Sequence, residues 1–163
     1  MTGSQNMLWM LDEYEAIQGV KSPGFITGKP VGMGGSLGRR ESAGYGVLIA
    51  IREALNELKL NTDQTTASVQ GFGSVAQNAI ALYQKIGGTV TCVSSWHHQD
   101  GQAYAYHKPN GIDLNELVSI SNHFGEIDRQ KAIDMGYECL PGDAAKRGTP
   151  DSNGKCHPGS TIC

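Results

Sequence analysis

The sequence has no long apolar run, no cluster of basic residues and no CxxC pair among its 163 residues. Without about 18 consecutive apolar residues it has no expected membrane span, and its start lacks the basic and apolar segments of a signal peptide. The 13 Lys and Arg residues are outnumbered by 16 Asp and Glu residues, which argues against a nucleic-acid partner. We therefore expect a soluble, cytoplasmic protein that binds neither membranes nor nucleic acid.

The cysteine and histidine positions do not indicate a fold held together by disulfides or by a metal ion. Cys92 and Cys139 lie in apolar, strand-like runs, where a buried thiol is the favoured interpretation. Only Cys156 and Cys163 are close in sequence, so a disulfide scaffold is not expected. The histidines show no ligand spacing, and we expect no metal site.

Hydrophobic periodicity predicts alternating helices and strands. The expected helices are residues 7–17, 45–60, 75–83, 113–124 and 128–135, and the expected strands are 65–70, 89–94 and 137–140. Residues 103–108 are expected to form a short strand or a hairpin arm. Asp113 is expected to cap its helix, with the Glu116 side chain reaching back to it. The order strand, helix, strand over residues 65–94 predicts a βαβ unit, whose two strands run parallel.

The turn inside that unit carries a glycine pattern. In "QGFGSVA", the residues Gly71, Gly73 and Ala76 form GxGxxA between the expected strand and helix. Gly71 permits a tight turn, Gly73 lets a pyrophosphate approach the backbone, and Ala76 allows close packing. The start of the helix offers backbone donors and a positive dipole end to an anion. The pattern predicts a dinucleotide site in a Rossmann-like α/β sheet, with a purely structural turn as the alternative.

An acid that binds ribose is expected about twenty residues past the glycines, and this sequence has Ser95 there. Without a carboxylate, both a ribose acceptor and the repulsion of a 2′-phosphate are missing. We therefore expect weak discrimination between NAD and NADP. His97 and His98 are the nearest groups that can compensate, but an adjacent pair in a polar loop is expected to be solvated, and contact with the cofactor is the alternative.

Longer segments resemble the nucleotide-binding half of the glutamate dehydrogenases, within the family that acts on glutamate, leucine, phenylalanine and valine. The segments are "ITGKPVGMGGSLGRRESAGYGV", "VQGFGSVA", "NGID" and "MGYECLPGDA", and the resemblance covers roughly residues 4–144. It implies an α/β fold with a Rossmann-like parallel sheet flanked by helices, which is incomplete here. It also implies NAD(P)-dependent oxidative deamination of glutamate by family members that are homo-oligomers.

The resemblance also implies site residues. Arg39 would lie near the nicotinamide, and the turn backbone would follow the pyrophosphate. The cofactor-binding residues carried over by position are Arg39, Ala43, Gly71, Phe72, Gly73, Ser74, Val75 and Ser95. The chain departs from the family at Ala43, where threonine is common, at Ser74, where asparagine is common, and at Ser95, where an acid is frequent.

The family's catalytic lysine and aspartate have no counterpart in this sequence, so no catalytic residue is assigned and the chain is expected to be inactive alone. Residues 1–18 would be a helix that packs on an absent substrate domain, 19–143 a partial NAD(P)-binding domain, and 144–163 a disordered tail unrelated to the family. The same interpretation, a fragment of a longer enzyme, predicts that Met1 is an internal start and that the reading frame is shifted near the end. A stand-alone dinucleotide-binding or regulatory module and a relic without function are the alternatives.

Overall fold

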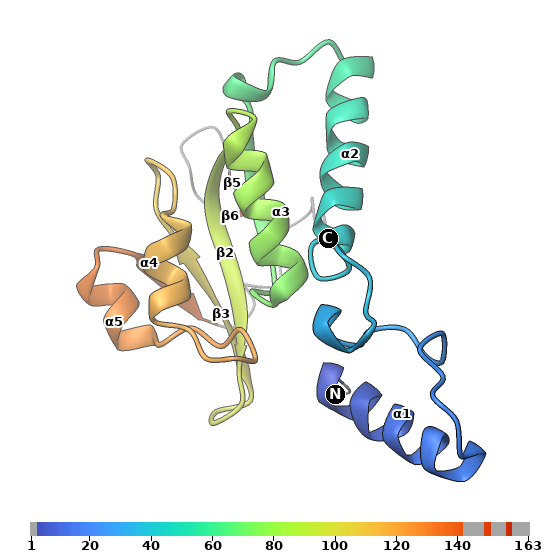
Figure 1. The fold of residues 1–163 in the computed structure, drawn as a ribbon. Coiled ribbons are helices and arrows are strands. Elements are labelled where there is room, and N and C mark those ends of the chain that lie inside the picture. The colour runs from blue at the N-terminus through green and yellow to red at the C-terminus, as the bar shows by residue number, and fades with distance from the viewer. Residues whose placement is uncertain (1–2, 142–148, 151–155, 158–163) are drawn as a thin grey trace. The chain divides into compact units, whose positions relative to one another are not determined.

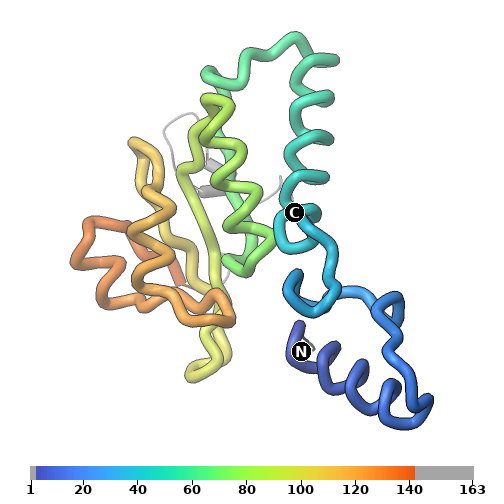
Figure 2. The backbone as a smooth tube through the Cα atoms, in the orientation of Figure 1, coloured from blue at the N-terminus to red at the C-terminus, as the bar shows by residue number. Residues whose placement is uncertain are grey.

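The computed structural model describes residues 3–141, 149–150 and 156–157. By its internal contacts the chain divides into two compact units, Met1–Ser42 and Ala43–Cys163. Figure 2 traces the backbone through both units. Within the described residues, no helix has both the length and the apolar character needed to cross a bilayer.

The first unit contains helix α1 (Ser4–Gln18) and a 3-10 turn, η1 (Val31–Met33). The helix ends where Gly19 adopts a left-handed conformation and its N–H donates to the carbonyl of Glu15. The Tyr14 and Phe25 rings stack with centroids 3.9 Å apart, which fixes the chain after α1 against that helix. The helix expected at residues 7–17 is therefore present and slightly longer.

The loop that follows α1 is organised around a buried lysine. Only 6% of Lys29 is exposed, and its ammonium donates to the carbonyls of Pro23, Phe25 and Ile26 at 2.9, 2.5 and 2.7 Å. An ammonium has three donors, and here each has an acceptor. These bonds replace regular secondary structure in a segment that its glycines and prolines keep irregular.

The second unit is built on a four-stranded sheet in the order β1-β2-β3-β4. The strands are β1 (Thr66–Gln70), β2 (Thr89–His97), β3 (Gln102–His107) and β4 (Glu138–Pro141). β1 and β2 are parallel, as the βαβ pattern predicts, whereas β3 is antiparallel to both β2 and β4. The α/β class is confirmed, and the sheet is mixed because a short hairpin joins β2 to β3.

Helices α3 (Ser74–Lys85), α4 (Leu114–Ser119) and α5 (Arg129–Asp134) cover one face of this sheet and share a core with it (Figure 1). Helix α2 (Ser42–Glu57) packs beside α3 and adds Leu48 to the same core, and a 3-10 turn, η2 (Thr62–Gln64), precedes β1. Ile80 of α3, Leu117 of α4 and Ala132 of α5 are buried in one cluster. That cluster includes Tyr104 and Tyr106 of β3, so the helices and the sheet form one core.

Two details of α4 differ from the sequence-based expectation. The helix ends at Ser119 instead of extending to residue 124, and the Ser119 hydroxyl donates to the carbonyl of Glu116, which competes with helix continuation. Asp113 caps α4 as predicted, accepting from the N–H groups of Asn115 and Glu116. The Glu116 side chain does not reach back, because its Oε2 accepts from Lys108 and Tyr137 instead.

Most of the expected tail at 144–163 lies outside the described residues. Its described parts are β5 (Thr149–Pro150) and β6 (Cys156–His157), which pair in an antiparallel two-stranded sheet.

Candidate functional site

The glycine turn begins where β1 ends. Gly71 has a φ of 87°, a left-handed conformation that favours glycine, and its N–H donates to the Ser94 hydroxyl at 3.4 Å. Phe72 is 2% exposed and belongs to the core, which anchors the turn to the sheet. Gly73 then caps α3 without any side-chain hydrogen bond. The turn is thus fixed by its flanks, while the backbone at Gly73 is exposed.

The start of α3 can accept an anion. In any α-helix the first N–H groups lack intrahelical acceptors, and here these belong to Ser74, Val75 and Ala76. A Cβ built on Gly71 or Gly73 meets nothing within 4 Å, so open space lies beside both glycines. Backbone donors, the positive end of the helix dipole and this open space together form a cradle that suits a phosphate.

Ser95 faces the core at the end of β2. It is 3% exposed, and its hydroxyl accepts from the N–H of Ile127 at 3.3 Å. Ser94 is also buried and accepts from Gly71, as described above. The sequence placed Ser95 at the ribose position, and in the structure its hydroxyl bonds to the loop that follows α4.

That loop, residues 121–127, joins the glycine turn to the end of β2. A Cβ built on Gly125 would lie 2.5 Å from the carbonyl oxygen of Phe72 and 2.8 Å from the nitrogen of Gly73, so the two backbones touch. The next residue, Glu126, accepts from the backbone N–H of His98 at 2.9 Å. Its other carboxylate oxygen accepts from the Asn122 side chain at 2.9 Å.

Glu126 is the carboxylate of this region, and the ring of His97 lies beside it. The backbone hydrogen bond from His98 and that from the Asn122 side chain lower the pKa of the Glu126 carboxyl, which keeps it ionised. His97 Nδ1 lies 3.6 Å from Glu126 Oε1, and its Nε2 lies 2.8 Å from the carbonyl of Ile127. We call the turn Gly71–Ser74 with Ser94, Ser95, His97 and Glu126 the glycine end of the sheet.

The remaining expected site residues lie in two different units. Arg39 belongs to the first unit and is exposed, and its carbonyl accepts from the Ser42 hydroxyl. Ala43 belongs to the second unit and is exposed in the first turn of α2. Sequence reasoning did not find Glu126, and its signal in the sequence is weak: a glycine beside an acid in a short polar loop.

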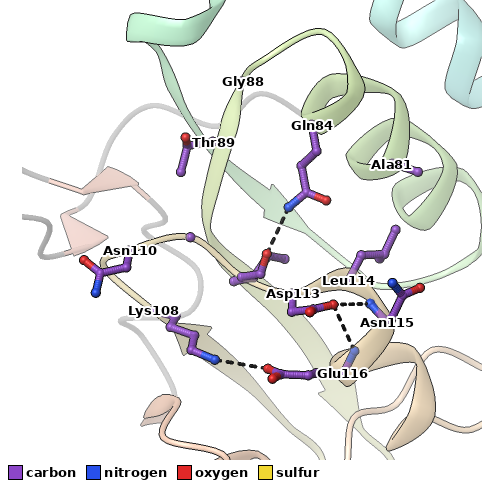
Figure 3. Close-up of a pocket in the computed structure, with 12 residues that line it drawn as sticks. Ala81, Gln84, Gly88, Thr89, Lys108, Asn110, Asp113, Leu114, Asn115 and Glu116 are labelled. Carbon is purple, nitrogen blue, oxygen red and sulfur yellow. Dashed lines mark hydrogen bonds and ion pairs between the residues drawn. The ribbon is translucent and has the colours of Figure 1, made fainter.

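The opposite end of the sheet holds an open hollow of about 690 Å³, shown in Figure 3. Lys108 pairs with Glu116 at 3.0 Å, and the ammonium lies 4.5 Å from the centre of the Tyr137 ring. Gln84 of α3 donates to the carbonyl of Ile112 at 2.9 Å. The hydrogen bond from Lys108 lowers the pKa of the Glu116 carboxyl most, and the hydrogen bond from Tyr137 lowers it further. We call this region the lysine end.

A second hollow, of about 560 Å³, runs along β1 between α2 and α3. Its walls are mostly apolar and include Val47, Ile51 and Leu55 of α2. β1 is an edge strand among the described strands, so its outer side faces this groove. The glycine turn closes one end of the groove, where polar backbone replaces apolar side chains.

Comparison with known proteins agrees with this geometry. Residues 34–147 match the family model for glutamate/leucine/phenylalanine/valine dehydrogenases. The chain belongs to this family. It is 38% identical over 126 residues to an NAD-specific glutamate dehydrogenase of Clostridioides difficile, covering 77% of this chain and 30% of that relative.

Solved structures of family members also match this chain over only part of their length. The glutamate dehydrogenase of Peptoniphilus asaccharolyticus is 37% identical with a TM-score of 0.60, covering 72% of this chain and 30% of that one. A hetero-hexameric glutamate dehydrogenase of Thermus thermophilus, in a leucine-bound form, is 29% identical with a TM-score of 0.68, covering 78% of this chain and 29% of that one. The chain therefore spans about 30% of the length of the relatives it matches.

Proposed function

We propose that the second unit binds NAD or NADP, as the nucleotide-binding portion of a glutamate dehydrogenase. The observation that carries this is the open backbone cradle at Gly71–Ser74, at the end of two parallel strands and the start of α3. In open α/β sheets, ligands bind outside the carboxyl ends of the strands. The pyrophosphate is proposed to lie on the N–H groups of Ser74 and Val75.

In the full-length enzyme of this type, hydride would pass from the α-carbon of L-glutamate to the nicotinamide, giving 2-oxoglutarate and ammonia after hydrolysis. The residues of this chain would supply binding and orientation. The turn would hold the pyrophosphate, and Arg39 and Ala43 would lie towards the nicotinamide by analogy with the family. We propose that this chain alone does not oxidise glutamate, since positioned acid and base groups contribute much of such catalysis.

Titration of the chain with NADH, followed by nicotinamide fluorescence, tests the proposal. The matched variant is Gly73→Phe, because Gly73 has an ordinary φ of −75° and open space beside it. The added ring would fill the space that the phosphate needs while leaving the fold intact. We expect binding to weaken by about a hundredfold or more, with an unchanged circular dichroism spectrum. Equal binding by both proteins would refute this location.

A stand-alone dinucleotide-binding module remains the second candidate, and one observation favours it over a relic. The core of the second unit is continuous and joins α2, α3, α4 and α5 to the sheet. Such a core supports cooperative unfolding of the isolated chain. A single cooperative transition in urea, with its midpoint raised by NADH, is expected of a functional module. A broad, non-cooperative transition would favour the relic.

A further inference from the structure

Two carboxylates lie near the end of β2, and only one of them is tied to the glycine turn. Asp100 is in the hairpin between β2 and β3, where it accepts from the Tyr104 hydroxyl at 2.5 Å and lies 3.9 Å from Arg129. Glu126 follows Gly125, whose backbone touches that of Phe72 and Gly73. It also accepts from the backbone of His98, directly after β2. Glu126 therefore connects the proposed phosphate cradle with the strand end where a ribose is held in Rossmann-like sites.

We propose that Glu126, and not residue 95, is the acid that recognises the adenosine ribose and makes this chain select NAD over NADP. The inference rests on the proposed dinucleotide binding and adds the residue that sets its specificity. The carboxylate accepts from the ribose 2′-hydroxyl of NAD. The same charge repels the 2′-phosphate of NADP.

The geometry leaves Glu126 the capacity for this contact. A carboxylate offers about four acceptor positions, and His98 N–H and the Asn122 amide use one on each oxygen. The two hydrogen bonds hold the Glu126 side chain in place. Because 17% of this side chain is exposed, a ligand can still reach it. Both hydrogen bonds come from neutral donors, and Nδ1 of His97 lies 3.6 Å from Oε1 of the same carboxylate.

Ser95 acts as a positioning residue in this arrangement. Its buried hydroxyl accepts from the N–H of Ile127, the residue that follows Glu126. His97 holds the same backbone through the Ile127 carbonyl at 2.8 Å. A short polar side chain at position 95 thus fixes the loop that carries the acid, and the ribose carboxylate comes from a different segment than the sequence pattern predicts.

The test measures dissociation constants of NADH and NADPH for the wild type, Glu126→Gln and Glu116→Gln. Glutamine keeps the size of Glu126 and an acceptor oxygen while removing the charge. Glu116→Gln is the matched control, because Glu116 is also a hydrogen-bonded carboxylate with a lowered pKa but lies at the lysine end. Glu126→Asp, which keeps the charge on a shorter side chain, is the second variant if the amide disturbs the loop.

We expect the wild type and Glu116→Gln to bind NADH at least about tenfold more tightly than NADPH. For Glu126→Gln the ratio should fall to within about threefold, chiefly because NADPH binds more tightly, and Glu126→Asp should retain preference for NADH. Binding with the same ratio in Glu126→Gln and the wild type would overturn this inference and leave the proposed function standing. Failure of every protein, the wild type included, to bind either cofactor would overturn both.

Discussion

The two ends of β2 differ in what their polar groups already bond to. At the lysine end, side chains satisfy one another: Lys108 pairs with Glu116, and Tyr137 donates to the same carboxylate. At the glycine end, the start of α3 presents backbone N–H groups without intrahelical acceptors beside open space. A hollow of about 690 Å³ lies at the lysine end, whereas the backbone N–H groups at the start of α3 lie at the glycine end.

This contrast teaches that the size of a hollow does not tell how many hydrogen-bonding groups it offers to a ligand. Polar groups that bond to each other stabilise the fold and have little left for a ligand. Backbone donors at a helix start can gain acceptors only from water or a ligand. The carboxyl ends of the parallel strands β1 and β2 also lie at the glycine end, which is where open α/β sheets bind ligands.

The largest effect should come from Gly125→Ala, which acts at the glycine end through the fold. Gly125 has a φ of 80°, and a Cβ there would lie 2.5 Å from the backbone oxygen of Phe72. Strain and displacement of the loop should cost about 2 to 4 kcal/mol of unfolding free energy. Urea denaturation measures this loss. Gly101→Ala is the matched control, because Gly101 also has a positive φ but has open space beside it; equal losses would show that the loop contact with Phe72 is unimportant.

A smaller effect is expected from Ser95→Ala. The variant leaves the N–H of Ile127 without its hydroxyl acceptor, at a cost of about 1 kcal/mol of unfolding free energy. The ratio of NADH to NADPH affinity should decrease only slightly, because Glu126 keeps its other partners. Urea denaturation and the two cofactor titrations measure both quantities. If the ratio changed as much as in Glu126→Gln, Ser95 would contact the ribose directly, as the sequence alone predicts.

The smallest expected effect is on how stability depends on pH, through Glu116 at the lysine end. Lys108 lowers the pKa of Glu116 below its usual value of 4.5, so the folded state binds fewer protons than the unfolded state. The resulting stabilisation is complete above pH 4.5 and is lost as the pH falls through the lowered pKa. Urea midpoints measured between pH 6 and about pH 3 should fall less steeply for Glu116→Gln than for the wild type. Parallel curves would mean that the Lys108 pair contributes nothing.

Much of this fold was predictable because strand patterns, glycine turns and helix caps depend on residues that are close together in the sequence. The alternation of β-branched residues and the GxGxxA turn fixed β1, α3 and β2, and Asp113 marked the start of α4. For "AYAYHK" the sequence left a short strand and a hairpin arm open, since a strand pattern carries no information about its partner; the structure makes it the second arm of the β2–β3 hairpin. Glu126 was missed for a related reason: its proposed role depends on its contact with His98 and on that of the neighbouring Gly125 with Phe72, both of which are distant in sequence.

The buried lysine of the first unit has a chemical consequence. All three donors of Lys29 are held by carbonyl oxygens, whereas the side chain of Lys21 is 89% exposed and has one carboxylate partner, Glu15. An acylating reagent needs access to the nitrogen lone pair, and Lys29 would first have to leave its three acceptors. The rate at which Lys29 is acylated, followed by mass spectrometry, therefore reports how often that loop opens. The rate for Lys21 gives the reference value for an unhindered amine.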